Sequence, residues 1–191
     1  DIAAERELLL VEDNPYGLLR YDGTIPPTVF SLDPSENVVY LGPFSKTISP
    51  GIRTEWVVSP TAVYQKLVLG KQAADLCSSP LNQLFVHEFV AGGMWRGYLE
   101  QLKKIYLARR NALLQALATE FPKGAVWTRP EGGFFVWATL PGDIDTGDLL
   151  VKAIEENVAF VRGDAFFADG QGTHSMRLNF SYTTEDLIAE G

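Results

Sequence analysis

The segment 44–53 carries a lysine and an arginine seven positions apart, in the order Phe-Ser-Lys-Thr-Ile-Ser-Pro-Gly-Ile-Arg. The glycine, proline and hydroxyl residues around them predict a loop. Such a loop can hold a phosphate group through the Ser45 hydroxyl, backbone N–H groups and the Arg53 guanidinium. Lys46 can act as an amine nucleophile where its surroundings keep the amine unprotonated. The alternative is that Lys46 and Arg53 are ordinary surface charges, and this segment alone leaves both interpretations open.

A second polar segment, Glu-Asp-Asn-Pro-Tyr-Gly at 12–17, follows the apolar run 8–11. In α/β proteins, ligands bind where the strands of the sheet end. The Asp13 carboxylate can pair there with a protonated ring nitrogen, and the Tyr16 hydroxyl can reach the same ligand. A turn formed by Asp, Asn and Pro beside a packed Tyr explains the same residues without any ligand.

Together the two segments resemble the fold type I, class I/II aminotransferases, which use pyridoxal 5′-phosphate (PLP). Within that family the chain is similar to the branch of 2-aminoadipate, aromatic and kynurenine aminotransferases. The matching stretches are VEDNPYG (11–17), FSKTISPGIR (44–53), KQAADL (71–76), PEGGFFVW (130–137), FFADG (166–170) and MRLNFS (176–181). The Ser-Lys-Thr and Pro-Gly-x-Arg pieces are the specific part of the match. Family members are longer than this chain, so the resemblance covers their C-terminal half.

The resemblance implies a role for each matching residue at the cofactor. Asp13 pairs with the pyridinium nitrogen of PLP, and Tyr16 hydrogen-bonds its phenolic oxygen. Lys46 forms a Schiff base with PLP and, once an amino acid has displaced it, moves a proton between the substrate Cα and the cofactor carbon. Ser45 and Arg53 bind the phosphate. These five residues are therefore the expected cofactor site, with Asp13, Tyr16 and Lys46 as its catalytic members.

Arg177 is implied to bind the α-carboxylate of the substrate in a bidentate pair. The alternative is a strand-edge arginine in a surface ion pair. The implied activity is transfer of an amino group from an α-amino acid to a 2-oxo acid, with 2-oxoglutarate as acceptor by family analogy. The whole protein is implied to be a homodimer.

The resemblance also implies that this chain alone lacks a complete active site. In the family, the N-terminal half supplies the glycine-rich helix start under the phosphate and the aromatic residue stacked on the ring. A second function stays open on the same residues. The same fold, with the same lysine, occurs as the PLP-binding effector domain of GntR/MocR-type transcriptional regulators. The sequence upstream of this chain would separate the two.

Three residues depart from the family pattern. Pro43 stands where the family often has a serine or threonine that contacts the phosphate. Glu55 stands two positions after Arg53, where family members usually carry a glycine. We expect its carboxylate to compete with the phosphate for the Arg53 guanidinium. Arg162 replaces a common proline. None of these changes removes a residue expected to be catalytic.

Composition excludes several other classes of protein. The chain has 191 residues, 46% of them hydrophobic, and a formal net charge of -8. This acidic balance argues against a nucleic-acid surface or a polybasic membrane patch. One cysteine, Cys77, allows no disulfide framework within the chain, and we expect it to be a small buried residue. Two histidines and one cysteine match no zinc motif. We expect a cytoplasmic protein with no metal.

Hydrophobic periodicity and turn residues predict alternating strands and helices. The predicted strands are 8–12, 28–31, 38–41, 54–59, 125–128, 134–139, 158–161 and 175–180. The predicted helices are one from residue 60 onward, 80–91, 94–120 and 146–157. Arg109 and Arg110 are assigned to the solvated face of the long helix.

The order of these elements predicts an α/β fold in two domains. The early strands are closely spaced, as expected for part of a sheet buried on both faces. The later elements indicate an α+β unit. With the resemblance, we expect residues 1–93 to be part of a PLP-binding large domain, a mainly parallel sheet with flanking helices. Residues 94–191 are expected to form a small C-terminal α+β domain.

Overall fold

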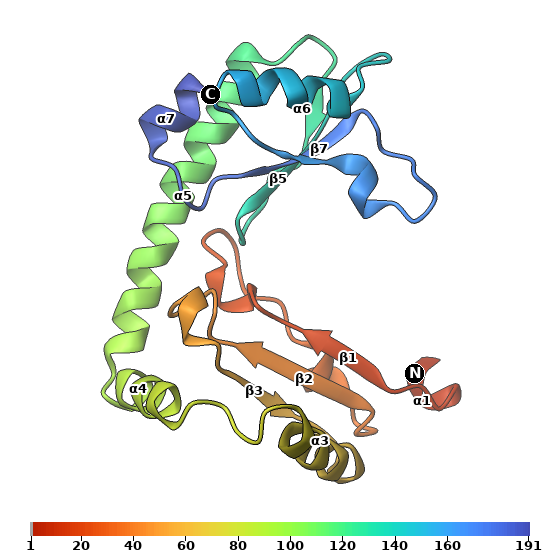
Figure 1. The fold of residues 1–191 in the computed structure, drawn as a ribbon, viewed down its shortest axis with the longest axis vertical. Coiled ribbons are helices and arrows are strands. Elements are labelled where there is room, and N and C mark those ends of the chain that lie inside the picture. Colours follow the sequence, from red (N-terminus) through yellow and green to blue (C-terminus); the bar gives the residue numbers. More distant parts are fainter. Residues whose placement is uncertain (1) are drawn as a thin grey trace. The chain divides into compact units, whose positions relative to one another are not determined.

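The computed structural model describes residues 2–191, which separate into two compact units between Gln101 and Leu102 (Figure 1). The helix α5 (Met94–Glu120) carries the chain from the first unit into the second. The predicted domain boundary after residue 93 stays a prediction, and each unit is described by itself. Within residues 2–191, every helix is too short or too polar to cross a bilayer.

The first unit is built on a three-stranded sheet in the order β1-β2-β3. Its strands are β1 (Leu10–Asp13), β2 (Val38–Pro43) and β3 (Glu55–Val58). β1 and β2 are parallel, with Asp13 opposite Leu41, whereas β2 and β3 are antiparallel, with Pro43 opposite Glu55. The parallel pair places the carboxyl ends of β1 and β2 at the same edge of the sheet.

Burial in this sheet is concentrated in the central strand. Val38 and Val39 of β2 are buried, but all four residues of β3 and three of the four in β1 are exposed. The faces of β1 and β3 are thus exposed in residues 2–191 alone, and their burial on both faces in the whole protein stays a prediction. Among the strands of residues 2–191, each of these two has a neighbouring strand on one side only.

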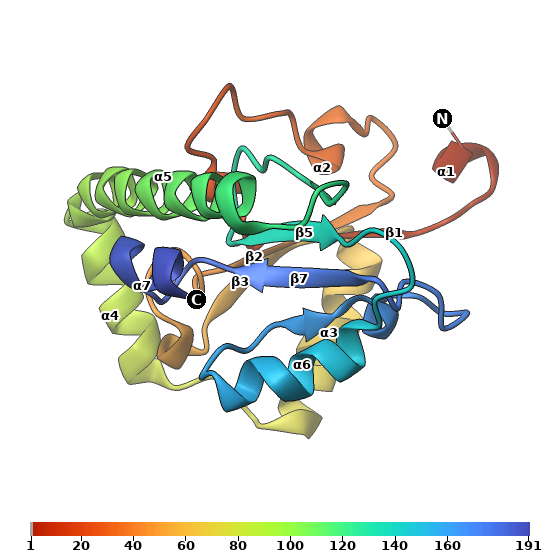
Figure 2. The same ribbon diagram turned by 90° about the horizontal axis from the view of Figure 1, so that it is seen from above.

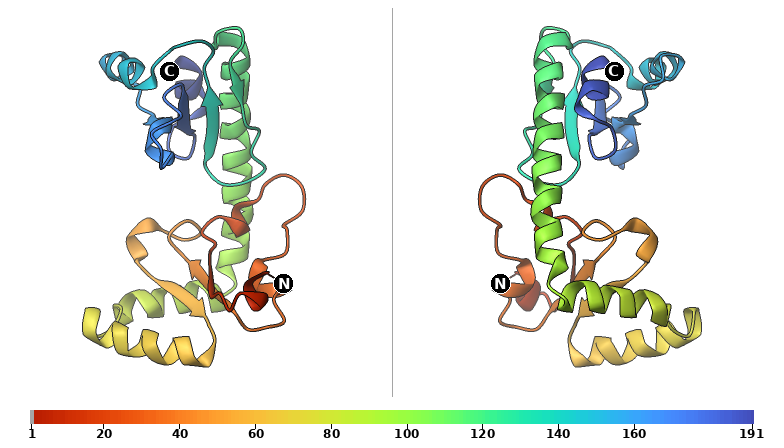
Figure 3. Two further views of the ribbon diagram at one scale, coloured as in Figure 1. Left: turned by 90° about the vertical axis from the view of Figure 1, so that its right-hand side faces the viewer. Right: turned by 90° about the vertical axis from the view of Figure 1, so that its left-hand side faces the viewer.

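Short and long helices surround this sheet. They are α1 (Ile2–Glu5), the 3-10 turn η1 (Gly17–Leu19), α2 (Val29–Leu32), the 3-10 turn η2 (Pro50–Ile52), α3 (Thr61–Ala74) and α4 (Pro80–Ala91). Figure 3 shows α3 and α4 following the sheet strands along the chain. The predicted limits of α4 are confirmed, because Ser79 caps its first turn and Pro80 occupies the first helical position.

The strand predicted at 28–31 is wrong, because α2 occupies this segment. The Thr28 side chain accepts a hydrogen bond from the Ser31 N–H at 3.0 Å and caps the turn. The Glu12 carboxylate accepts a second one from the Phe30 N–H at 2.9 Å. Two of the helix-start N–H groups thus find side-chain acceptors, one of them 18 residues away in sequence.

The second unit pairs a four-stranded antiparallel sheet with helices, as expected for an α+β unit (Figure 2). In the order β4-β5-β7-β6, its strands are Val126–Trp127, Phe135–Thr139, Ser175–Asn179 and Val161–Arg162. The remaining elements are α6 (Thr146–Glu155), the 3-10 turn η3 (Gly163–Phe166) and α7 (Glu185–Glu190).

The register of β5 and β7 divides their side chains between two faces. Ala138 and Met176 lie opposite each other and form the buried core together with Leu140. Trp137 and Arg177 lie opposite each other on the other face. The core face fixes the register of the sheet, so it also fixes where the Arg177 side chain points.

Two expectations for individual side chains are wrong. Arg110 is only 2% exposed, and its Nη1 donates to the Pro130 carbonyl at 2.8 Å instead of facing solvent. The neighbouring Arg109 donates to the Ser181 carbonyl. Both arginines therefore satisfy loop carbonyls beside α5, which apolar spacing along the helix does not reveal. Cys77 is exposed rather than buried, because it lies in the bend between α3 and α4.

Candidate active site

Asp13 is the last residue of β1, at the edge where the two parallel strands end. The Asn14 N–H donates to the Leu41 carbonyl at 3.1 Å and continues the pairing one residue further. The Asp13 side chain is exposed and makes no hydrogen bond or ion pair with any residue between 2 and 191. The backbone is fixed by the sheet, and the carboxylate is available to a ligand.

The turn after Asp13 holds Tyr16 in a half-buried position. Asn14 organises this turn, because its Oδ1 accepts from the Gly17 N–H at 2.8 Å and its Nδ2 donates to the Tyr40 hydroxyl at 3.1 Å. A Cβ at Gly17 would lie 2.5 Å from the Asn14 side chain, so glycine is needed there. The Asp-Asn-Pro turn is thus present, and it places Tyr16 beside the end of β1.

Lys46 lies in a tight loop directly after β2, which we call the lysine loop (residues 44–54). The Phe44 N–H donates to the Thr54 carbonyl at 3.1 Å and closes the loop. The Ile48 N–H donates to the Phe44 carbonyl at 2.8 Å, which makes a helical turn around Lys46. The Lys46 side chain is half-buried, and no described residue hydrogen-bonds or ion-pairs with it.

Side chains distant in sequence anchor the lysine loop. Tyr98 of α5 donates to the Ile48 carbonyl at 3.4 Å, and Asn82 of α4 donates to the Ile52 carbonyl at 3.0 Å. Their sequence separations are 50 and 30 residues, so sequence patterns gave no signal for them. These contacts satisfy loop carbonyls that lack strand partners, and they restrict the positions Lys46 can take.

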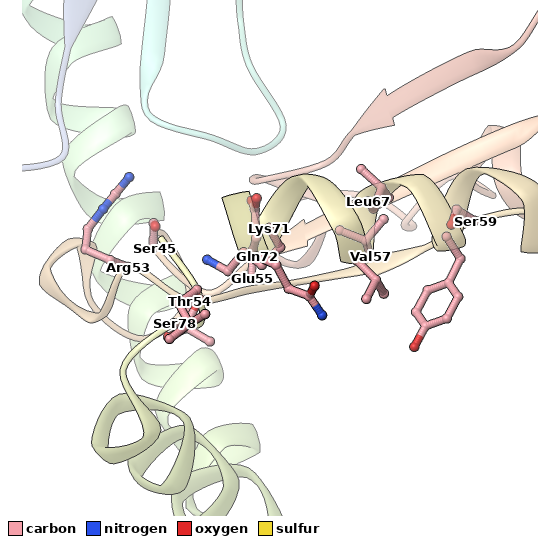
Figure 4. Close-up of a pocket in the computed structure, with 13 residues that line it drawn as sticks. Ser45, Arg53, Thr54, Glu55, Val57, Ser59, Leu67, Lys71, Gln72 and Ser78 are labelled. Atoms are coloured by element: carbon pink, nitrogen blue, oxygen red, sulfur yellow. The ribbon is translucent and has the colours of Figure 1, made fainter. Parts of the chain in front are cut away.

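Ser45 and Arg53 line one pocket of about 560 Å³ beside α3 (Figure 4). Arg53 has a left-handed backbone, with φ of 47° and ψ of 40°, and its side chain is exposed. Its Nη1 makes a long hydrogen bond of 3.4 Å to the Pro50 carbonyl. Most of the guanidinium N–H groups therefore remain available for an anion, and the role of Arg53 as a phosphate contact stays a prediction.

Glu55 lines the same pocket as Ser45 and Arg53. No ion pair joins Glu55 to Arg53 in the part of the chain that the structure describes, so the expected competition for the guanidinium is not seen. Lys71, also in the pocket, pairs with Asp75 at 2.7 Å. The pocket thus carries one uncompensated carboxylate next to the two groups expected to bind phosphate.

Arg177 lies in the second unit, on β7 between β5 and β6. Its guanidinium carbon is 4.1 Å from the centre of the Phe135 ring and 4.7 Å from that of Phe166. Its Nε is buried and has no hydrogen-bond partner. A strand-edge arginine in a surface ion pair does not fit, because β7 is an interior strand and no described residue pairs with the guanidinium.

The side chains of the first unit fit the groups that PLP presents. A carboxylate suits a ring nitrogen, a phenol suits a phenolic oxygen, an amine suits an aldehyde, and a hydroxyl with a guanidinium suits a phosphate. Asp13, Tyr16, Ser45, Lys46 and Arg53 supply this set from one sheet edge and the loop that follows it. Among residues 2–191, no cluster of His, Cys, Asp and Glu could hold a metal ion.

Comparison with known proteins finds aminotransferases that are similar to this chain in both sequence and structure. The chain is 42% identical over 191 residues to the aromatic-amino-acid aminotransferase 1 of Thermococcus litoralis, covering 100% of this chain and 46% of that protein. The solved kynurenine aminotransferase of Pyrococcus horikoshii superposes with a TM-score of 0.95 at 42% identity, over 100% of this chain and 47% of that one. The resemblance to the fold type I aminotransferases is confirmed.

A second solved relative is the α-aminoadipate aminotransferase LysN of Thermus thermophilus, with a TM-score of 0.93 at 41% identity. It covers 100% of this chain and 49% of that one. The chain thus spans about half the length of the curated relatives it matches. The Pyrococcus enzyme was solved in complex with PMP, and LysN with N-(5′-phosphopyridoxyl)-L-leucine.

The chain also matches an uncharacterised HTH-type transcriptional regulator of Bacillus subtilis at 32% identity, over 39% of that protein. No protein-family model matches the chain.

Proposed function

We propose that the protein containing this chain is a PLP-dependent aminotransferase and that Lys46 holds its cofactor. The observation that carries the proposal is the position of Lys46. Its unpaired amine follows β2 directly, and the unpaired Asp13 carboxylate ends the neighbouring parallel strand. Ligands bind at such strand ends in α/β folds. Relatives that are 41–42% identical to this chain are aminotransferases, two of them solved with PMP or a phosphopyridoxyl group.

The chemistry that PLP supplies when bound is withdrawal of electrons from the substrate Cα. Asp13 would keep the ring nitrogen protonated, which strengthens that withdrawal, and Tyr16 would hydrogen-bond the phenolic oxygen. Ser45 and Arg53 would bind the phosphate and fix the position of the ring. Lys46 Nζ, once free, would take the proton from the substrate Cα and return it on the cofactor side.

Arg177 would bind the substrate carboxylate, since no hydrogen bond or ion pair is seen for its guanidinium among the described residues. A buried N–H without a partner is costly, and a carboxylate ligand would satisfy it. The proposed substrates are therefore an α-amino acid and a 2-oxo acid, with 2-oxoglutarate as acceptor. The homodimer and the cytoplasmic location also stay predictions.

Trapping with borohydride tests the assignment of Lys46. Reduction converts the carbon–nitrogen double bond between a lysine and a bound aldehyde into a stable secondary amine. We expect the purified whole protein to be yellow, to lose this colour on reduction, and to carry one pyridoxyl group on the peptide containing Lys46. Peptide mapping by mass spectrometry gives the position. A label on Lys71, which also lies near the pocket, or no label at all, would rule out Lys46.

Replacing Glu55 with glycine is expected to tighten PLP binding about threefold to tenfold, because it removes a carboxylate next to the phosphate contacts. Titration of the cofactor-free whole protein with PLP, followed by absorbance, gives the dissociation constant. Glu55→Gln keeps the size and removes the charge, so it should show most of the gain. High salt should reduce the difference. Unchanged or weaker binding in both variants would show that the carboxylate does not act on the phosphate.

A second candidate function is favoured by the match to an HTH-type transcriptional regulator. In that case the chain would bind PLP as an effector domain, and the whole protein would bind DNA elsewhere. The two candidates differ in turnover. When an acceptor is present, an aminotransferase releases many equivalents of 2-oxo acid per protein molecule. A PLP-binding effector domain would stop after one equivalent or fewer.

A further inference from the structure

The guanidinium of Arg177 lies over two aromatic rings from different parts of the second unit. Phe135 belongs to β5, and Phe166 ends η3, which follows β6. The guanidinium carbon is 4.1 Å from one ring centre and 4.7 Å from the other. These distances lie within the range of cation–π attraction. No hydrogen bond or ion pair of this guanidinium is seen among residues 2–191.

The sheet register explains how Phe135 reaches Arg177. Phe135 lies opposite Asn179, and Trp137 lies opposite Arg177, so Phe135 is a diagonal neighbour of Arg177 on the same face. Aromatic and long side chains reach across such diagonals. Because the core on the opposite face fixes the register, the position of this ring is set by the fold.

Phe166 approaches from the other side of β7, and a second aromatic residue supports it. Its ring packs edge-on against Trp137 with centroids 5.4 Å apart. Phe167, the next residue, also packs against Trp137, at 6.2 Å, but contacts no cation. Phe166 and Phe167 thus share the same aromatic neighbour, and only Phe166 touches Arg177.

This arrangement leaves the guanidinium oriented and without a hydrogen-bond acceptor. Its Nε is buried and has no hydrogen-bond partner, and the two aromatic rings that lie within 5 Å of its guanidinium carbon offer no hydrogen-bond acceptor of their own. A planar guanidinium donates in its own plane, as a fork that matches a carboxylate. An arginine held in this way has lost much of its rotamer freedom before the ligand arrives, which lowers the entropic cost of binding.

We propose that Phe135 and Phe166 are positioning residues that hold the Arg177 guanidinium as a preformed fork for a substrate carboxylate. The proposal rests on the proposed function in naming the substrate, and it goes further in assigning carboxylate selectivity to two residues with no polar group. They act through Arg177 and not on the reacting atoms. Loss of a ring should therefore impair substrates with a carboxylate and leave an amine without one unaffected.

The test compares Phe166→Leu with Phe166→Tyr and Phe167→Leu in the whole protein loaded with PLP. Leucine removes the ring face, tyrosine keeps it, and Phe167→Leu removes an adjacent ring that packs against Trp137 and not over Arg177. The readout is kcat/KM for phenylalanine and for 2-phenylethylamine, its analogue without the carboxylate. We expect Phe166→Leu to lower kcat/KM for the amino acid about tenfold, mainly through KM, and to leave the amine unchanged. Tyrosine should restore the amino acid value, and Phe167→Leu should keep the ratio of the two substrates.

The proposal is overturned if Phe166→Leu lowers both substrates equally or if Phe167→Leu changes the ratio as much. A binding measurement separates this result from failure of the proposed function. The dissociation constant of 3-phenylpropionate, a carboxylate without an amino group, is measured by calorimetry for each variant. If the protein carries no pyridoxyl label on Lys46 and does not transaminate, the proposed function fails. The positioning role then depends on this constant alone, and equal or undetectable binding in wild type and Phe166→Leu overturns it.

Discussion

Replacing Asp13 with alanine in the whole protein is expected to slow transamination roughly a hundredfold while weakening PLP retention far less. Asp13 ends β1 with an exposed, unpaired carboxylate, so its removal leaves the sheet intact. Loss of one partner of a charge pair in a ligand site costs about 3 kcal/mol, which is about a hundredfold in rate. The phosphate contacts at Ser45 and Arg53 remain and supply much of the cofactor binding.

The measurement for Asp13 has two parts, the rate of the half-reaction with an amino acid and the dissociation constant of PLP. Asp13→Asn serves as a matched variant, because it keeps the size and a hydrogen-bonding group but removes the charge. If the negative charge of Asp13 keeps the PLP ring nitrogen protonated, the half-reaction of Asp13→Asn should also be slow. Near-normal turnover in both variants would show that Asp13 only forms the turn with Asn14 and Pro15.

The second large effect is expected for Arg177→Lys. Lysine keeps the charge but loses the planar fork that pairs with a carboxylate at two points. We expect kcat/KM for an amino acid to fall roughly a hundredfold, which corresponds to a loss of about 3 kcal/mol of transition-state stabilisation. The value of kcat/KM for an amine that lacks a carboxylate should not change. Because Phe135 and Phe166 contact the flat guanidinium of Arg177, we do not expect the ammonium of the substituted lysine to occupy the same position.

An exposed arginine of the same unit provides the control for Arg177. Arg129 is exposed, so Arg129→Lys should leave both substrates unchanged. If Arg177→Lys impairs the amino acid and the amine equally, Arg177 supports the sheet rather than the substrate. The proposal of an α-amino acid substrate would then lose its main residue, while labelling of Lys46 could still succeed.

The chain's local patterns predict the long helices and propose the candidate site residues. The apolar spacing at 94–120 and the Ser79 cap before Pro80 depend on neighbouring residues only, so the limits of α4 and α5 follow from the sequence. The motif around Lys46 and Arg53 follows in the same way, because a loop made of Gly, Pro and hydroxyl residues is a local property. That motif also carried the resemblance to the aminotransferases, which the comparisons confirm.

Tertiary structure decided the contacts between residues distant in sequence. Glu12 supplies an acceptor to the first turn of α2, which turned a segment of strand-forming residues into a helix. Arg110 is buried because a loop carbonyl near residue 130 needs a donor. Tyr98 and Asn82 anchor the lysine loop, and the register of β5 and β7 brings Phe135 to Arg177. In each case a polar or charged group is satisfied by a partner that the fold brings near, and no local periodicity encodes which partner that is.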